Sequence, residues 1–415
     1  MPVSLTEKRM TMDKKGSVLI IGAGRSGRGM LGELFDRDGW QLIFADNDTQ
    51  LVEGLRKQNY YTVQMTDLST NENQERRIEN FKVLDTVSDY EEYIDAVINA
   101  DYVATALKPD AFEQVAKDLA AAVARLTDLK LNKKVLVTLG ANYVGLYQTF
   151  DTLIRKALDT ELIPAYEASM CLIMSIVNRK NLLPDTAHKT EDQYRIIGDN
   201  KPILRVDDLP VLREKAELPA FFRLEKNLDL AMVYKIWTGN LVQCSMAFVA
   251  LKDGIEYTNE AAHHPQASLY AYYAAVEGYN GVAAEYYLPP RSDEEAKKTV
   301  TIFRNEEFQD SLHRIAREPI RKFGRNDRFL GPAFCCIKHG IVPYYITKCL
   351  AYGFFYYNEH DPQSVELRRR IENEGIEQVI QSCCSLHLEA EYDAIIYQLI
   401  LNAYYEILGK NPLDE

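Results

Sequence analysis

Four residues near the amino terminus have the types and the spacing needed to hold a dinucleotide. Gly22, Gly24 and Gly27 form a G-x-G-x-x-G pattern directly after the apolar run 18–21, and Asp46 follows about twenty residues later. The first glycine permits a tight turn, the second lets the backbone approach a pyrophosphate, and the third lets a helix pack against a strand. The sequence therefore predicts a dinucleotide-binding turn.

The acidic residue also indicates which dinucleotide is preferred. Asp46 can accept hydrogen bonds from ribose hydroxyls, and its charge would repel a 2′-phosphate. Asn47 and Asp48 follow it, so no arginine is there to neutralise such a phosphate. NAD is therefore favoured over NADP. The further cofactor contacts that we expect come from the glycine turn and from later strand ends, and they are Arg25, Ser26, Ala106, Lys108 and Asn142.

A doubly wound α/β domain is needed to position these residues. Strand-like runs at 41–45, 60–65, 81–84, 101–107 and 134–139 alternate with helical patterns at 49–58, 89–99 and 109–124, and 69–74 is predicted to be an exposed loop. The strand ends near Gly22, Ala106 and Gly140 should then share the carboxyl edge of a parallel sheet. Ligands bind at that edge in folds of this class.

The character of the sequence changes in its second half. The stretch 178–219 has short strand-like runs at 194–197 and 203–206 and extends the first domain. From residue 221 helical patterns dominate, at 221–252, 265–284, 293–316, 332–357, 362–382 and 388–408. We predict a flexible lead-in (1–16), an NAD-binding Rossmann-type α/β domain with an extension (17–219), and a predominantly α-helical substrate and catalytic domain (220–415).

Composition excludes several classes of function. The chain has 415 residues, 47% of them hydrophobic, and a net charge of −13, which argues against a general nucleic-acid or anionic-membrane surface. No apolar run is long enough to cross a bilayer, and the amino terminus lacks a hydrophobic signal core. The seven cysteines are scattered without a C-x-x-C pair. This pattern indicates reduced cytoplasmic thiols and no zinc site.

Three separated stretches resemble one family. Lys235 and Asn240 bracket the run Ile-Trp-Thr-Gly, in the manner of a K-x-x-x-x-N signature, and the segments 317–328 and 361–367 add to the likeness. The chain resembles the polyol-specific long-chain dehydrogenases (the mannitol dehydrogenase family), and in particular their mannitol-1-phosphate 5-dehydrogenase branch. The resemblance implies a Rossmann-type domain, a helical carboxyl-terminal domain, and metal-independent oxidation of a secondary alcohol on a sugar alcohol or its phosphate.

The resemblance also implies catalytic roles. Lys235 would be the base that removes the hydroxyl proton, provided that its surroundings lower its pKa. Asn142 and Asn240 would donate hydrogen bonds to the oxyanion, and Gln243 could bind a substrate hydroxyl. On a regular helix Lys235, Gln243 and Asn240 fall at about 0°, 80° and 140° around the axis, so all three can face one pocket. The alternatives are a surface lysine at 235 and a turn residue at 142.

The sequence departs from the family pattern at four places. Gln243 stands where the family commonly has His, and Lys108 stands where a small residue is usual beside the cofactor. Ala141 replaces a Glu beside Asn142. Cys171-Leu172 replaces an Asp-Arg pair after a strand that is expected to end near residue 169. These departures leave the identity of the substrate less well defined than the class of reaction.

A basic segment could recognise an anionic substrate. Six cations lie within fifteen residues, namely Arg314, Arg317, Arg321, Lys322, Arg325 and Arg328. Arg321, Lys322 and Arg328 are the stronger candidates for a phosphate or carboxylate site, and His339 could line the same cleft. The alternative is a solvated charged face paired with Glu306, Glu307 and Asp310.

The predicted function is an NAD-dependent oxidoreductase of sugar alcohols, ketoses or their phosphates, acting as a monomer or dimer. A first alternative keeps the same core as a hexuronate reductase or an unphosphorylated-polyol dehydrogenase. A second alternative is an NAD-binding regulatory protein with a decayed active site, which Gln243 and Cys171-Leu172 would fit.

Overall fold

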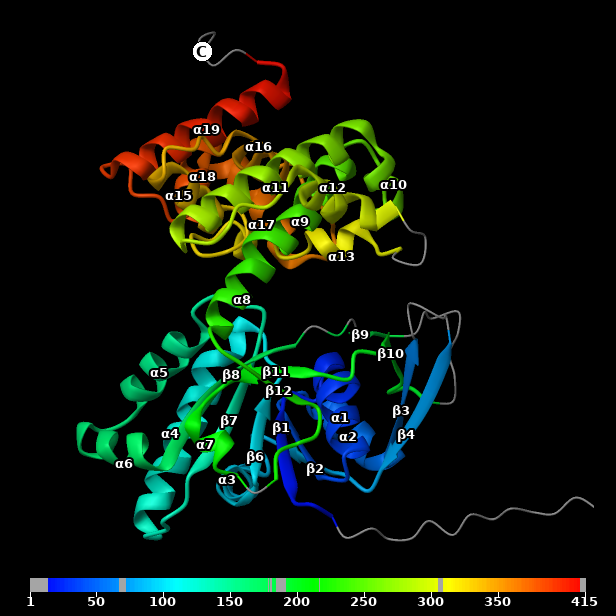
Figure 1. The fold of residues 1–415 in the computed structure, drawn as a ribbon, viewed down its shortest axis with the longest axis vertical. Coiled ribbons are helices and arrows are strands. Elements are labelled where there is room, and N and C mark those ends of the chain that lie inside the picture. Colours follow the sequence, from blue (N-terminus) through cyan, green and yellow to red (C-terminus); the bar gives the residue numbers. More distant parts are fainter. Residues whose placement is uncertain are drawn as a thin grey trace, which may run out of the picture. The chain divides into compact units, whose positions relative to one another are not determined.

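The chain folds into two compact units, which are residues 1–229 and residues 230–415 (Figure 1). The computed structural model describes residues 14–66, 72–177, 179, 181–183, 192–215, 217–304 and 309–410. Most of the predicted lead-in, residues 1–13, lies outside these ranges. The sequence-predicted boundary at residue 219 falls before strand β12 (Phe222–Glu225), which belongs to the sheet of the first unit.

The first unit is organised around an eight-stranded sheet in the order β12-β11-β8-β7-β6-β1-β2-β5. The other strands are β1 (Ser17–Ile21), β2 (Gln41–Asp46), β5 (Lys82–Asp85), β6 (Tyr102–Thr105), β7 (Val135–Gly140), β8 (Met170–Ile176) and β11 (Leu204–Asp207). All neighbouring pairs run parallel except β11 with β8. This topology confirms the predicted Rossmann-type domain.

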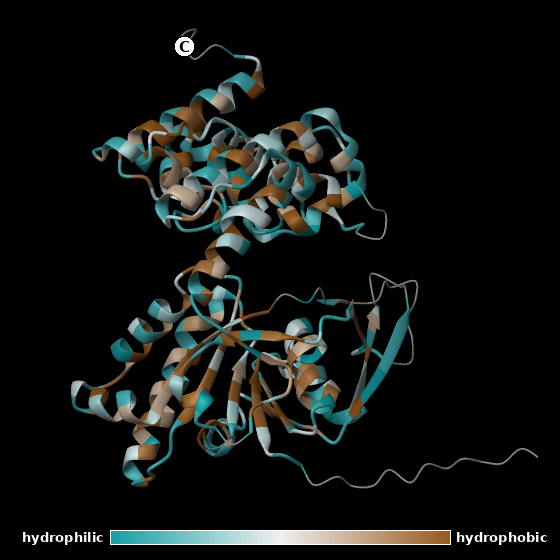
Figure 2. Cartoon of the chain, viewed as in Figure 1, coloured by the Kyte–Doolittle hydropathy of each residue, from teal (hydrophilic) through white to brown (hydrophobic). Residues whose placement is uncertain are grey.

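Both faces of this sheet are buried, as the continuous apolar runs predict. Val18 and Ile20 of β1 pack in a cluster with Met30, while Leu19 and Ile21 point to the opposite face and are also buried. The central strands are accordingly hydrophobic in Figure 2. The helices of the unit are α1 (Glu33–Arg37), α2 (Thr49–Gln58), α3 (Tyr90–Asn99), α4 (Phe112–Asp128), α5 (Leu146–Ala157), α6 (Ile163–Ser169) and α7 (Pro210–Arg213).

A second, four-stranded sheet in the order β4-β3-β10-β9 completes the first unit. Its strands are β3 (Tyr60–Thr66), β4 (Asn73–Glu79), β9 (Asn181–Leu182) and β10 (Ile196–Asp199). The sequence missed β4, and part of it was predicted to be loop. The reason is its polar composition: in β4 only Ile78 is buried, and the strand is largely hydrophilic in Figure 2. Residues 67–71, which include part of the predicted loop, lie outside the described part of the chain.

The second unit is helical, as predicted. Its helices are α8 (Leu228–Tyr234, which starts in the first unit), a π-helical segment η5 (Lys235–Asn240), α9 (Leu241–Lys252), α10 (Thr258–His263), α11 (Pro265–Glu285), α12 (Asp293–Thr301), α13 (Leu312–Ala316), α14 (Pro319–Lys322), α15 (Leu330–Lys338), α16 (Tyr344–Gly353), α17 (Pro362–Glu374), α18 (Ile376–Cys383) and α19 (Glu391–Leu408).

Several predicted long helices are in fact interrupted. The stretch 221–252 begins as strand β12 and becomes helical only at α8. The stretch 332–357 is divided between α15 and α16, because Gly340 has a φ of +73° and Pro343 precedes the second helix. Gly375, with a φ of +82°, similarly separates α17 from α18. Amphipathic periodicity alone did not locate these breaks.

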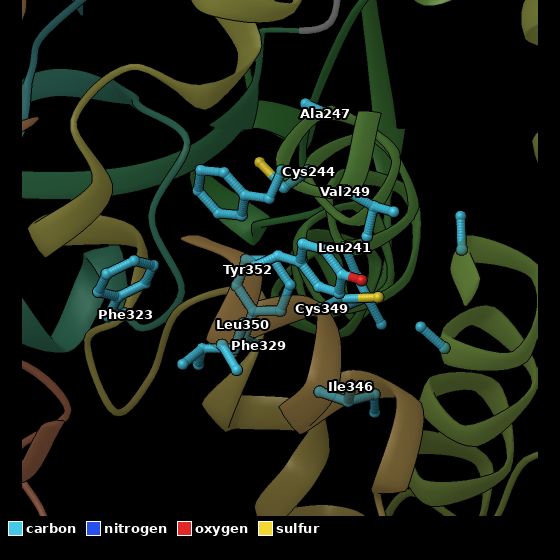
Figure 3. Close-up of a cluster of buried hydrophobic side chains, with 14 of the residues drawn as sticks. Leu241, Cys244, Ala247, Val249, Phe323, Phe329, Ile346, Cys349, Leu350 and Tyr352 are labelled. Atoms are coloured by element: carbon cyan, nitrogen blue, oxygen red, sulfur yellow. The ribbon is translucent and has the colours of Figure 1, made fainter. Parts of the chain in front are cut away.

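Helix α9 is the centre of the core of the second unit. Its residues 244–250 are all buried, and it packs against α11, α13 and α16. Figure 3 shows side chains of α9 beside Phe323, Phe329 and residues of α16. The Phe248 ring stacks on Phe329 at a centroid distance of 5.8 Å and contacts Phe323 at 6.0 Å. The basic segment 314–328 is therefore attached to the core through Phe323 and through Phe329, which directly follows it.

Candidate active site

The glycine turn has the geometry that its sequence predicts. Gly22 follows β1 with a φ of +97°, and a Cβ there would lie 2.5 Å from the carbonyl oxygen of Ala106. A Cβ at Gly27 would lie 1.8 Å from the Gly22 carbonyl oxygen. A Cβ at Gly24, by contrast, would have no surrounding atom within 4 Å beyond its chain neighbours. Two of the glycines therefore permit close packing, and the third faces open space.

A helix begins immediately after this turn. Residues 25–37 are continuously helical and include a π-helical segment, η1 (Gly27–Gly32). Ser26 is half-buried at its first turn, and the Arg28 amide donates to the Gly24 carbonyl at 3.0 Å. The first amides of a helix lack partners within the helix and lie at its positive dipole end. This end suits a diphosphate.

Asp46 lies beside the turn, at the carboxyl end of β2. Its Oδ2 accepts a hydrogen bond from the Ala23 amide at 2.7 Å, and its Oδ1 accepts one from the Asp48 amide at 3.0 Å. A carboxylate has about four acceptor positions, so these two bonds leave capacity for ribose hydroxyls. The two backbone bonds fix the orientation of the carboxylate next to the glycines.

The neighbouring strand ends bring further predicted residues to the same edge. The Ala106 amide donates to the Ile21 carbonyl at 2.9 Å, directly below the turn. Lys108 follows two residues later, and Asn142 is exposed just after β7. Since β1, β6 and β7 are adjacent and parallel, their ends share one edge of the sheet. The predicted cofactor residues are thus grouped within the first unit.

The sequence analysis predicted that Cys171-Leu172 follows a strand, at the place of the family's Asp-Arg pair, and this position was wrong. Strand β8 begins at Met170, so Cys171 and Leu172 lie inside it, paired with Leu136 and Val137 of β7. They do not follow a strand. The carboxyl end of β8 is Ile176, and the sequence after it contains Asn178-Arg179.

Arg179 has a structural role in this region. Its buried guanidinium pairs with the fully buried Glu33 at 2.8 Å and donates to the carbonyl oxygens of Gly29 and Lys201. It thereby connects the helix after the glycine turn to the segment that follows β8. Asn178 lies outside the described residues. The sequence analysis missed Arg179 because it expected the strand to end near residue 169. The family's Asp-Arg pair was therefore sought at residues 171–172 and not after Ile176.

In the second unit, Lys235 and Asn240 begin and end the π-helical segment η5. The prediction of a regular helix here was therefore wrong. In a π-helix the hydrogen bonds run between residues five apart, so position 240 returns over position 235 after one widened turn. On a regular helix the two would be about 140° apart. Lys235 is half-buried, as is Gln243 on α9.

Trp237 holds this segment against the rest of the unit. Its indole Nε1 donates to the Asn326 carbonyl at 3.0 Å. A Cβ at Gly331 would lie 2.2 Å from the Trp237 ring, so glycine is required for this close contact. The π-helical segment is therefore joined directly to the basic segment around Asn326. Sequence reasoning assigned no role to Trp237, although its place between Lys235 and Asn240 was visible.

Two of the three favoured cations of the basic segment, Arg321 and Arg328, are paired with acids. Asp327 pairs with Arg321 at 3.1 Å and with Arg328 at 2.8 Å, and Glu318 pairs with Arg321 at 2.9 Å. Although burial opposes its charge, the Asp327 carboxylate raises the pKa of Arg328. The predicted alternative of a solvated face does not apply to Arg328, which is 7% exposed.

The solvated-face alternative does describe the start of the basic segment. Arg314 is exposed and pairs with Asp310, four residues earlier in the chain. Glu306 and Glu307, the other acids named for this alternative, lie outside the described residues. The basic segment is therefore divided between a surface ion pair and a buried group of cations.

Lys322 differs from its neighbours. It is 4% exposed, and no described carboxylate lies within ion-pairing distance of its ammonium group. Burial, together with Arg328 and Arg321, lowers its pKa to about 7. Cys244 lies nearby, and Arg328 donates to its Sγ at 3.4 Å. Sequence reasoning missed Cys244, which directly follows Gln243, and it missed Asp327 inside the basic run.

His339 is separated from these cations. It follows α15, whereas Arg328 precedes it, and the helix is about 13 Å long. Its Nε2 is 2.8 Å from Glu285, which also pairs with Lys338. The structure therefore brings Arg321, Lys322 and Arg328 together and places His339 at the other end of the helix.

The described residues form neither a cluster of metal-binding side chains nor a membrane-spanning helix. No group of three His, Cys, Asp or Glu side chains in the described ranges could hold a metal ion. All seven cysteines are free thiols. No described helix is both long and apolar enough to span a bilayer.

Comparison with known proteins identifies the family. The family model of the mannitol dehydrogenase Rossmann domain matches residues 16–216, and that of the mannitol dehydrogenase C-terminal domain matches residues 233–394. The chain therefore belongs to the mannitol dehydrogenase family.

Individual relatives agree with this assignment. Mannitol-1-phosphate 5-dehydrogenase of Bacillus licheniformis is 25% identical over 397 residues, which are 92% of this chain and 98% of the relative. The enzyme of the same name from Bacillus velezensis is 26% identical over 388 residues, covering 91% and 98%. The structure of Pseudomonas fluorescens mannitol 2-dehydrogenase, in a ternary complex with NAD and D-mannitol, has a TM-score of 0.74 at 14% identity. It covers 97% of this chain and 96% of its own.

Proposed function

We propose that this protein is an NAD-dependent oxidoreductase that interconverts a secondary alcohol and a ketone on a sugar alcohol or its phosphate. Family membership and the names of the relatives support the reaction class. The observation that carries the cofactor assignment is the glycine turn, with open space at Gly24 and the Asp46 carboxylate held beside it. When bound there, NAD supplies a hydride acceptor.

The residues of the turn fit this cofactor. Gly24 leaves room for a pyrophosphate to approach the backbone, and the first amides of helix 25–37 can donate to its oxygens. Arg25, Ser26, Ala106 and Lys108 lie at the same edge of the sheet and complete the proposed binding site. The negative charge of Asp46 favours the ribose hydroxyls of NAD over the 2′-phosphate of NADP.

The proposed chemistry needs a proton acceptor and donors to the reacting oxygen. We assign the proton to the amine of Lys235, without a metal ion. Asn142 and Asn240 donate hydrogen bonds to the oxygen as its negative charge develops, and such donors typically contribute about 3 kcal/mol to the transition state. The π-helical turn between Lys235 and Asn240 supports a shared role, because it brings positions five apart onto one side of the helix.

Between a phosphorylated and a free sugar alcohol, the residues of the second unit favour the phosphorylated substrate. Lys322 is a buried cation without a carboxylate partner among the described residues, and Arg321 and Arg328 flank it. An anionic group bound at Lys322 would supply the missing countercharge. His339 is not part of this proposal, since its Nε2 faces Glu285.

Two other functions make different predictions. For a free-polyol dehydrogenase or hexuronate reductase, inorganic phosphate should not compete with the substrate. For a phosphate-specific enzyme it should be a competitive inhibitor. A regulatory protein would bind NADH but give no turnover on a panel of polyols, ketoses and aldonates. The relatives, which are named as dehydrogenases, favour an active enzyme.

The decisive experiment for the catalytic assignment is Lys235→Met. We expect the variant to fold and to bind NADH like the wild type, and to lose at least about a hundredfold in turnover, since general base catalysis contributes that much or more. Lys298→Met is a matched control, because Lys298 is an exposed lysine of α12 in the same unit. It should retain full activity. Near-normal turnover by Lys235→Met would refute the assignment.

A further inference from the structure

Arg28 is a buried residue that contacts the glycine turn in two ways. It is the second residue of the π-helical segment η1, and only 3% of its surface is exposed. Its backbone amide donates to the Gly24 carbonyl at 3.0 Å, and its guanidinium Nη1 donates to the Ala23 carbonyl. One residue therefore binds two successive carbonyls of the turn, the first through its side chain and the second through its main chain.

The charge of Arg28 is not neutralised by direct contact with a carboxylate. Asp46 and Asp192 act on it electrostatically, but neither forms a salt bridge with it, and its Nε has no hydrogen-bond partner among the described residues. Asp192 instead accepts from the Gln58 side chain and the Thr62 amide, both at 2.6 Å. Burial lowers the pKa of Arg28, but a guanidinium stays protonated at neutral pH. A bound anion would therefore offset a buried positive charge.

Two tyrosines fix the position of this guanidinium. Its central carbon lies 5.9 Å from the ring centre of Tyr61 and 5.9 Å from that of Tyr194, and arginine stacks favourably on aromatic rings. Tyr61 is fully buried, and its hydroxyl donates to the Arg28 carbonyl at 3.2 Å. A Cβ at Gly54 would lie 1.6 Å from the Tyr194 hydroxyl, so this tyrosine packs tightly against α2. The two rings stabilise the arginine where it meets the Ala23 carbonyl.

The bond to the Ala23 carbonyl determines where the next amide points. The peptide bond between Ala23 and Gly24 is trans, so its C=O and N–H groups point in opposite directions. Because the carbonyl points to the buried guanidinium, the Gly24 N–H points away from it. No described group accepts a hydrogen bond from this amide, and a Cβ at Gly24 would have no surrounding atom within 4 Å beyond its chain neighbours. The Gly24 amide is therefore a donor available to a ligand.

Asp46 holds the preceding peptide unit of the turn. Its Oδ2 accepts from the Ala23 amide at 2.7 Å. The N–H of Ala23 is thus bound to a carboxylate and its C=O to a guanidinium, which fixes the peptide units on both sides of this residue. A turn that is already held in its binding conformation loses less entropy when a ligand binds.

We propose that Arg28 is a positioning residue of the cofactor site, which directs the Gly24 amide toward a diphosphate and adds a buried positive charge that attracts this anion. The inference rests on the proposed function, since it deepens the assignment of the cofactor site. It concerns the diphosphate part of the cofactor alone. Arg28 acts through the backbone of the turn, and the binding of the adenosine part does not depend on it.

Calorimetric titration of the full-length protein with ADP and with adenosine tests the proposal. The two ligands share the nucleoside, but only ADP carries the diphosphate. Arg28→Met should weaken ADP binding by at least about tenfold and change adenosine binding by less than about twofold, since a hydrogen bond to a charged group contributes about tenfold or more. A variant that only destabilised the fold would lower both affinities alike. An unchanged ratio of the two affinities would overturn the proposal.

A conservative variant and a matched control complete the comparison. Arg28→Lys keeps the charge without the planar fork, and it replaces Arg28→Met if circular dichroism shows that the methionine variant does not fold. Its affinity for ADP relative to adenosine should fall by about two- to tenfold, and a wild-type ratio would again overturn the proposal. Arg77→Met is the control, because Arg77 also lies over a tyrosine ring, that of Tyr60 at 3.7 Å, but is 54% exposed on β4. It should change neither affinity.

The wild-type protein separates this inference from the proposed function. If it failed to bind NADH and ADP, the cofactor site itself would be refuted. If it bound both, and the Arg28 variants kept its ratio of affinities, only the role of Arg28 would be refuted. In 15N-glycine-labelled protein the Gly24 amide resonance, assigned from its absence in Gly24→Ala, should shift on addition of ADP and stay in place with adenosine. An equal response to both ligands would contradict the role of this amide.

Discussion

Replacing Lys322 by Met should stabilise the second unit at neutral pH. The folded state lowers the pKa of Lys322 from its ordinary 10.5 to about 7, chiefly by burial. Each unit by which the pKa is lowered costs about 1.4 kcal/mol. The buried lysine therefore lowers the free energy of unfolding by roughly 4 kcal/mol at pH 7. Methionine fills a similar volume without a charge, so most of this penalty should disappear.

The sign of the pH dependence is part of the prediction. Between about pH 7 and pH 10.5 the unfolded chain binds a proton at Lys322 that the folded chain does not, so the stability of the wild type rises with pH across this range. The advantage of Lys322→Met should therefore be largest near pH 7 and small at pH 10. A variant whose advantage does not change with pH would refute the reasoning.

Urea unfolding followed by tryptophan fluorescence provides the assay. The chain has two tryptophans, Trp40 in the first unit and Trp237 in the second. A Trp40→Phe background therefore reports on the second unit alone. Lys348→Met is a matched control, because Lys348 is also buried but donates to Glu406 at 2.7 Å. Hydrogen bonds to Glu406 and Tyr344 outweigh its burial and raise its pKa, so its loss should destabilise the unit.

Three further predictions concern the cofactor and the substrate. Gly24→Ala should leave the melting temperature nearly unchanged but greatly weaken NADH binding. Gly27→Ala should destabilise the fold by about 1–3 kcal/mol or more, because the added Cβ would meet the Gly22 carbonyl oxygen. Asp46→Ala should weaken NADH binding by about tenfold or more and reduce the preference over NADPH, as fluorescence titration would measure. The KM for a phosphorylated polyol should rise above about pH 7 as Lys322 loses its proton, while the KM for a free polyol should not. Unchanged NADH binding in Gly24→Ala or Asp46→Ala, or parallel KM profiles, would contradict these expectations.

The sheet and the glycine turn were predictable because their signals are local. A buried strand is a short apolar run, and Gly22, Gly24 and Gly27 each meet a constraint set by a few neighbouring atoms. The same holds for Asp46, which is the last residue of its strand. The predicted order of strand ends at one edge followed from the parallel alternation of strands and helices.

The missed features depend on contacts between distant residues. The π-helical turn at Lys235 is packed against Asn326 and Gly331, and no local periodicity reveals such contacts. Lys322 is buried beside Arg321 and Arg328, which pair with Asp327, and this burial also comes from tertiary packing. Strand β4 was missed since only one of its residues is buried. Cys171 was predicted to follow a strand, but β8 begins at Met170, so Cys171 lies inside the strand.

One measurement tests the central claim most directly. The purified protein should be incubated with NAD and, separately, with mannitol 1-phosphate and free mannitol, and NADH should be followed by its absorbance. We predict NADH formation that depends on Lys235 and is faster with the phosphorylated substrate. Clear NADH binding without any turnover of polyols, ketoses or their phosphates would contradict the claim.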